Sequence, residues 1–196
     1  MSKRTAEIRR KTKETDITLR LNLDGTGKYD VDTGVGFFDH MMELFAKHGS
    51  FDLSIRCRGD LKVDSHHSVE DVGICLGEAV AKAAGDKKGI NRYGFFTLPM
   101  DEALAEAAVD LGGRPYFTLK GKLPRSEPGG FPPELMADFF KAVTDAGRLN
   151  LHLTLRSGRN SHHCIEALFK AFARSLSAAC APGKNPDAVP STKGVL

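Results

Sequence analysis

The sequence predicts an α+β protein built from two copies of one βαβα-type half-domain, packed sheet beside sheet with helices on the other face. Internal repetition carries this prediction, because the pattern His-His-x-x-Glu occurs at 66–70 and again at 162–166. In each copy a glycine precedes the first histidine, by 17 residues in the first copy and by 15 in the second. We therefore divide the single domain into a first half-repeat, 1–92, and a second half-repeat with the C-terminal tail, 93–196.

Each half-repeat is expected to contain a strand hairpin, a helix, a strand and a second helix, in that order. The segment 17–31 alternates apolar and polar residues and turns at Asp24-Gly25, which is typical of a hairpin. Its counterpart by the repeat is 104–119, where alanine and glutamate favour a helix locally. The repeat argues for strand instead, so we predict a second hairpin there.

The remaining elements follow in the same order in both halves. The first helices span 37–48 and 134–146, and each ends just before a glycine, the usual C-terminal stop. Strand-like segments at 51–57 and 149–155 come next. The second helices begin at the histidine pairs, and their apolar residues recur at helical spacing. The apolar side chains expected in the core include Met41, Phe169 and Phe172.

Composition and charge narrow the class of protein. The formal net charge is only +3, which is too small for a protein that binds nucleic acid through bulk charge. The N-terminus has no apolar stretch typical of a signal peptide, and no run approaches the ~18 apolar residues that span a bilayer. We expect a soluble, cytoplasmic chain with neither a membrane nor a nucleic-acid partner. The cysteines expected to be reduced and structural are Cys57, Cys75, Cys164 and Cys180.

Three polar segments rich in glycine or proline are expected to be irregular. They are the connector 85–94 between the halves, the loop 124–133 and the tail 182–196.

The histidine pairs are candidate metal ligands. On a helix, His66 and Glu70 lie on one face, whereas His67 is rotated by roughly 100°. Adjacent histidines therefore point at two different ions, which predicts two metal sites shared between the halves or between subunits. Imidazole and carboxylate without thiolate suit Mn²⁺, Fe²⁺ or Zn²⁺, and an octahedral site favours Mn²⁺. The candidate ligands are His40, His66, His67, Glu70, Asp138, His162, His163 and Glu166.

Several long motifs are similar to those of one enzyme family. They are FFDHMMELFAKHG (37–49), DSHHSVEDVGICLGEA (64–79), NRYG (91–94), DLGGRPYF (110–117), NSHHCIEALFKAFARSL (160–176) and PSTKGVL (190–196). Together they resemble imidazoleglycerol-phosphate dehydratase over nearly the whole chain, from about Arg9 onward. The resemblance implies a hydro-lyase of histidine biosynthesis that converts D-erythro-imidazole glycerol phosphate to imidazole acetol phosphate and water. It also implies two Mn²⁺ ions per subunit and a homo-oligomer of 24 subunits with sites between subunits.

The resemblance also implies residue roles. One ion would be held by His40, His67, Glu166 and His162 of a neighbouring subunit, and the other by His66, Glu70 and His163. At Asp138 the family often has a histidine instead, so a shorter ligand stands there. Acid/base catalysis would fall to Glu14, with His48 and Asp101 nearby. The implied substrate-binding residues are Glu14, His40, His48, His66, Glu70, Arg92, Arg114, His162, Lys170, Ser191, Thr192 and Lys193, with the cations among them serving the phosphate.

The chemistry accounts for two metal sites. No carbonyl acidifies the proton that is lost, so two ions on the two ring nitrogens would stabilise an imidazolate that helps expel the hydroxyl. One alternative is a dimetal phosphoesterase, whose ions lie about 3.5–4 Å apart. Diverging histidines predict a wider spacing instead. A second alternative is a non-catalytic metal-storing shell or scaffold, against which basic residues suited to phosphate argue.

Overall fold

The fold is an α+β sandwich, described by a computed structural model for residues 4–194 and 196. The elements are β1 (Thr5–Lys11), β2 (Thr15–Asn22), β3 (Tyr29–Asp32), α1 (Gly36–Gly49), β4 (Asp52–Gly59), α2 (His66–Ala84), β5 (Tyr93–Met100), β6 (Ala103–Asp110), β7 (Tyr116–Lys120), the short 3₁₀ helix η1 (Pro128–Gly130), α3 (Leu135–Gly147), β8 (Asn150–Ser157) and α4 (Ser161–Cys180). Strands and α-helices follow one another in the same order in both halves. The predicted α+β class and the duplication are therefore confirmed.

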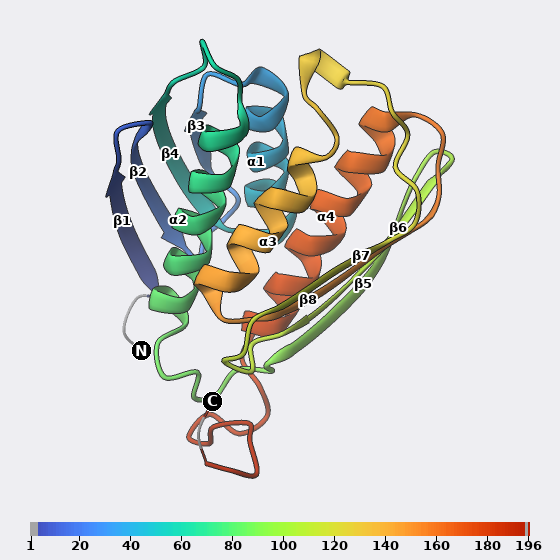
Figure 1. The fold of residues 1–196 in the computed structure, drawn as a ribbon. Helices are drawn as coiled ribbons and strands as arrows, with labels where there is room; N and C mark the ends of the chain where they lie inside the picture. The colour runs from blue at the N-terminus through green and yellow to red at the C-terminus, as the bar shows by residue number, and fades with distance from the viewer. Residues whose placement is uncertain (1–3, 195) are drawn as a thin grey trace.

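The layers are arranged differently from the expected placement of one sheet beside the other. Helices α1 and α2 pack on the sheet of β1–β4, and α3 and α4 pack on the sheet of β5–β8. The helices then pack on each other, α2 along α3 and α1 along α4, so the two sheets form the outer faces of the molecule (Figure 1). Most residues of α4 are buried, because this helix has a sheet on one side and helices on the other.

Both predicted hairpins are wrong, although the strands themselves exist. The strand orders are β1-β2-β4-β3 and β5-β6-β8-β7. In the segment 17–31, β2 and β3 do not pair, because β4 lies between them, antiparallel to β2 and parallel to β3. In 104–119, β8 separates β6 from β7 in the same way. The turn at Gly25 lies against the start of β4, so a Cβ on Gly25 would lie 2.2 Å from the backbone nitrogen of Asp52.

The hairpins that do form are β1–β2 and β5–β6, whose first strands the sequence analysis missed. The edge strand β1 is largely charged and polar, so it lacks the apolar alternation that predicts a strand. Strand β5 begins inside the expected connector 85–94 and contains Pro99, which is tolerated because β5 is also an edge strand. The boundary between the half-repeats at 92/93 stays a prediction.

The glycines that end α1 and α3 act differently from the expected stop signal. Gly49 and Gly147 remain helical, and the left-handed residues are Ser50 (φ 59°) and Arg148 (φ 49°). A Cβ on Gly49 would lie 2.3 Å from the Phe51 ring. The glycine is therefore needed for close packing rather than for backbone freedom.

The core contains the side chains that the helical spacing predicts. Met41, Phe169 and Phe172 are fully buried, as expected. All four cysteines are free and buried, which also agrees with the sequence analysis, and burial raises the pKa of the Cys75 thiol to about 12. Among the described residues, no helix has the length and apolarity to cross a bilayer.

The contact between α2 and α3 predicts a strong effect of one added methyl group. In Gly77→Ala, the new Cβ would lie 2.5 Å from the Val143 carbonyl oxygen and 2.7 Å from the Gly147 nitrogen. We expect a destabilisation of ~1–3 kcal/mol from overpacking, although alanine itself favours a helix interior. The thermal unfolding midpoint measures this effect. Gly36→Ala is the control, because a Cβ there meets nothing within 4 Å and should leave the midpoint unchanged or slightly raised. Equal midpoints for both variants would contradict the close packing.

Candidate metal and substrate site

The first candidate metal cluster joins the two halves of the chain. His40 lies on α1, and His162 and Glu166 lie on α4, with one ligand atom of each within 4.8 Å of the others. Glu166 Oε2 is 2.9 Å from His162 Nε2 and 3.6 Å from His40 Nε2. The packing of α1 along α4 creates this cluster. The resemblance implied that His162 comes from a neighbouring subunit, whereas here it lies beside Glu166 of its own chain.

A second cluster stands at the equivalent place between α2 and α3. His66 Nε2 is 3.8 Å from Glu70 Oε2, and His66 Nδ1 is 3.8 Å from Asp138 Oδ2. By the repeat, Asp138 occupies the position of His40. The i, i+4 spacing in HHxxE thus places a histidine and a carboxylate on one face of each helix, as expected.

The second histidine of each pair points elsewhere. The ring planes of His66 and His67 cross at 88°, and those of His162 and His163 at 82°. This divergence follows from the helical rotation between neighbouring residues. These outward histidines, His67 and His163, contact acidic side chains outside the two clusters.

Acidic side chains surround His67. Its Nδ1 is 3.1 Å from Asp60 Oδ2, and its Nε2 is 3.9 Å from Glu14 Oε1. The hydrogen bond with Asp60 raises the pKa of His67. Glu14, the expected acid/base residue, thus lies beside one histidine pair.

His163 has a matching environment. Its Nδ1 is 2.9 Å from Glu102 Oε2 and 3.9 Å from Asp101 Oδ2. The hydrogen bond with Glu102 raises the pKa of His163, and it lowers the pKa of Glu102 to about 2. Asp60 and Glu102 were not among the residues predicted from the sequence. Glu102 adjoins the candidate Asp101, but no pattern marked Asp60.

Glu166 is the buried member of the first cluster, with 6% of its surface exposed. Burial raises the pKa of its carboxyl, but the bonds from Lys170 Nζ, 2.5 Å away, and from His162 outweigh burial and lower the pKa overall. The carboxylate is thereby kept ionised, as a metal ligand must be. His48 stands near this group, and burial, followed by the positive charge of Lys170, lowers the pKa of its imidazole.

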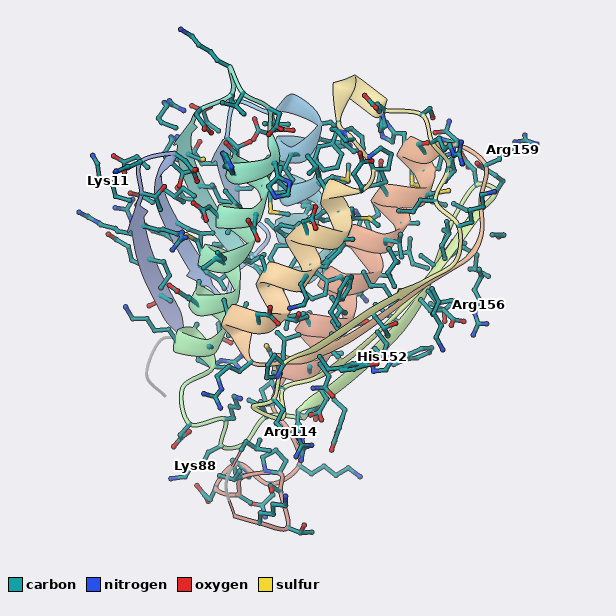
Figure 2. All side chains as sticks on the ribbon, in the orientation of Figure 1. Lys11, Lys88, Arg114, His152, Arg156 and Arg159 are labelled. Atoms are coloured by element: carbon teal, nitrogen blue, oxygen red, sulfur yellow. The ribbon has the colours of Figure 1, made fainter. Side chains whose placement is uncertain are left out.

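The other expected phosphate ligands lie at the opposite end of the molecule. The Arg92 backbone N–H donates to the Ala179 carbonyl near the end of α4. At 1.5 Å per residue, Ala179 lies about 25 Å along the helix from His162. Figure 2 shows Arg114 at that same end and Arg159, just before α4, at the other. The tail with Ser191, Thr192 and Lys193 is also at the Arg114 end (Figure 1). One chain alone therefore does not bring these cations to the histidines.

Arg92 holds the tail in place. Its Nε lies 2.7 Å from Asp110 Oδ1, and its side chain also donates to the Pro190 carbonyl over 2.9 Å. Gly89 and Ala188 are joined by a further backbone hydrogen bond. The segment before Ser191 is thus fastened to the loop that precedes β5.

The donor atoms fit metal ions. Nitrogen and carboxylate oxygen ligands bind divalent metals at about 2.0–2.2 Å, so donors on opposite sides of one ion stand about 4 Å apart. The donors of the first cluster lie within 4.8 Å of one another, whereas in the second Glu70 faces Nε2 and Asp138 faces Nδ1 of the same His66 ring, each over 3.8 Å. Small side-chain adjustments would bring the first set to an ion, whereas in the second the His66 ring would have to turn one nitrogen toward both carboxylates.

Comparisons with known proteins identify the family of the chain. Residues 33–176 match the family model described as imidazoleglycerol-phosphate dehydratase. The chain is 54% identical over 194 residues to an imidazoleglycerol-phosphate dehydratase of Cereibacter sphaeroides (strain KD131 / KCTC 12085), covering 98% of this chain and 100% of the relative. It is 55% identical over 195 residues to one of Salinibacter ruber, covering 100% of this chain and 96% of the relative.

Two solved structures are also similar. The imidazoleglycerol-phosphate dehydratase of Staphylococcus aureus subsp. aureus N315 matches with a TM-score of 0.83 and 38% identity, covering 91% of this chain and 99% of that one. The enzyme of Pyrococcus furiosus, solved in complex with (S)-C348, matches with a TM-score of 0.83 and 35% identity, covering 96% and 100%. The chain therefore belongs to the imidazoleglycerol-phosphate dehydratase family, hydro-lyases of histidine biosynthesis.

Proposed function

We propose that the chain is a cytoplasmic dimanganese dehydratase that converts D-erythro-imidazole glycerol phosphate to imidazole acetol phosphate and water. The observation that carries this proposal is the cluster His40–His162–Glu166, whose ligand atoms converge, together with its repeat-related counterpart His66–Glu70–Asp138. A substrate ring with two nitrogens needs two separate partners, and the fold offers one converging cluster and one related to it by the repeat. Imidazole and carboxylate donors without thiolate favour Mn²⁺ among the candidate ions.

The first cluster would hold one ion with three ligands of a single chain, and the second would hold an ion through one nitrogen of His66 with Glu70 or Asp138. The outward histidines, His67 and His163, would supply a further ligand to the ions of a neighbouring copy. When bound, the ions supply Lewis-acid stabilisation of negative charge on the imidazole ring. This arrangement revises the implied ligand sets, because His162 stays with its own Glu166 and His67 crosses between subunits instead.

The chain's own carboxylates would move the protons. The reaction removes a hydroxyl from the carbon beside the ring and a proton from the next carbon, and the resulting enol becomes the ketone. Glu14 Oε1, exposed beside His67, would accept that proton and deliver a proton to the departing hydroxyl, which leaves as water. Asp101, beside His163, and the uncharged imidazole of His48, next to Lys170, would assist.

The phosphate would be bound by cations of another copy. The Arg92 backbone lies about 25 Å along α4 from His162, which is too far for a small substrate to reach both, and Arg114 and the tail with Lys193 lie at the Arg92 end. We therefore propose that the Arg92 end of one subunit, with Ser191 and Thr192, meets the histidine end of the next. Lys170 would contribute from beside Glu166. Such a head-to-tail arrangement fits a closed homo-oligomer, and the resemblance points to 24 subunits.

Metal dependence tests the function itself. Protein stripped with chelator should not dehydrate imidazole glycerol phosphate, and added Mn²⁺ should restore turnover with a break near two ions per subunit. The restored activity is measured against the metal added. Full activity in the stripped protein would mean that the clusters serve the fold alone.

Removal of one cluster ligand should stop the reaction. In His66→Ala we expect turnover to fall at least about a hundredfold. Even the loss of a residue that only hydrogen-bonds to a metal ligand lowers metal affinity or activity about 10–100-fold. The matched control is His152→Ala on the outer face of β8, where the ring lies against Tyr116, and its turnover should be unchanged. Full activity of His66→Ala would refute the site assignment.

Loss of a phosphate cation should weaken substrate binding more than turnover. For Arg114→Ala we expect KM to rise about tenfold or more with a smaller change in kcat, because a charge-assisted bond to phosphate is lost. Arg156→Ala is the control, since Arg156 pairs with Glu106 on β6. An unchanged KM in steady-state kinetics would remove Arg114 from the phosphate site.

A further inference from the structure

The second histidine of each pair is held at Nδ1 by a carboxylate. His67 Nδ1 is 3.1 and 3.2 Å from the two oxygens of Asp60, and His163 Nδ1 is 2.9 Å from Glu102 Oε2. An ionised carboxylate only accepts hydrogen bonds, so Nδ1 must carry the proton in both rings. The neutral ring then has its lone pair on Nε2, which is the atom left to bind a metal ion.

We propose that Asp60 and Glu102 are positioning residues that fix His67 and His163 in the tautomer and orientation needed to ligate a metal ion through Nε2. This inference rests on the proposed function, because it assigns a purpose to two residues that face the outward histidines. A carboxylate behind a ligating histidine both orients the ring and makes it a stronger donor.

The duplication supports this role, because the two carboxylates do not occupy equivalent positions. Asp60 directly follows β4, and its counterpart in the second half, Gly158, has no side chain. A Cβ at Gly158 would lie 2.3 Å from the Cys164 sulfur. The second half instead supplies Glu102 from the turn between β5 and β6. Glu14, which precedes β2 as Glu102 precedes β6, approaches His67 only at Nε2, over 3.9 Å. The first half therefore supplies a carboxylate for Nδ1 from a different loop.

The Glu102 carboxylate is hydrogen-bonded to the backbone, and Asp60 is held through its own main chain. Glu102 Oε1 accepts the Asn160 backbone N–H over 2.9 Å, at the start of α4, while Oε2 faces His163. The Asp60 N–H donates to the Glu14 carbonyl over 3.0 Å, and the Asp60 carbonyl accepts from Val63. The Glu102 carboxylate is thus fixed at the start of α4, and the Asp60 main chain is fixed beside the start of β2.

The nearest acidic groups leave the outer nitrogen free. Glu14 Oε1 is 3.9 Å from His67 Nε2, beyond hydrogen-bond range, and Asp101 approaches His163 on the Nδ1 side. Within 4–194, neither Nε2 atom makes a hydrogen bond.

The test is Mn²⁺ binding to chelator-stripped full-length protein, measured by calorimetry without substrate. In Asp60→Asn and Glu102→Gln we expect the Kd of one class of site to rise about 10–100-fold. Asp60→Leu should bind more weakly than Asp60→Asn, because the amide oxygen still accepts from Nδ1 and leucine offers no acceptor. The matched controls, Asp30→Asn and Glu7→Gln, remove a charge from exposed ion pairs and should keep the wild-type Kd.

The results distinguish the positioning role of Asp60 and Glu102 from the proposed function. If wild-type protein binds two Mn²⁺ ions per subunit and every Asp60 and Glu102 variant matches its Kd, the positioning role is wrong and the proposed function stands. If wild-type protein binds no Mn²⁺, the proposed function is wrong as well. Should Asp60→Leu fail to fold, Asp60→Asn and Glu102→Gln decide the question, because both variants retain a polar side chain of nearly the same shape.

Discussion

The candidate site depends on the crosswise packing of α1 along α4 and of α2 along α3. Each helix pair contains one helix from each half of the chain, so each metal cluster takes ligands from both halves. Small residues allow this approach: a Cβ on Gly73 or Gly77 in α2 would lie within 2.7 Å of a backbone carbonyl of α3. The ligand geometry and the hydrophobic core are therefore set by the same contacts, and a change in helix spacing would alter both.

Duplication gives the site its chemistry. The two clusters are related by the repeat. In each histidine pair the first ring belongs to a cluster, and the second ring contacts a carboxylate outside it. The symmetry is not complete, because Asp138 stands where His40 stands in the other half, and Lys170 pairs with Glu166. The two clusters therefore differ in charge, and the electrostatic balance of the two sites differs with it.

Local periodicity and motif spacing allowed the helices, the central strands and the pairing of His66 with Glu70 to be predicted. The pairing of β2 with β3 was predicted wrongly, because β4 inserts between strands that are neighbours in sequence, and no local signal shows this. Asp60 was missed because its contact joins a loop to a helix start, where spacing in sequence carries no information. The distance of Arg92 from the histidines follows from the length of α4, which motif matching does not reveal.

The central claim is that one ion belongs to each crosswise cluster. Anomalous diffraction at the manganese edge, from crystals of the Mn²⁺-loaded protein, tests it most directly. We expect two peaks per subunit, one within ligand distance of His40, His162 and Glu166 and one within ligand distance of His66 and of Glu70 or Asp138. Two peaks about 3.5–4 Å apart, as in dimetal phosphoesterases, or a single peak away from both clusters, would contradict it.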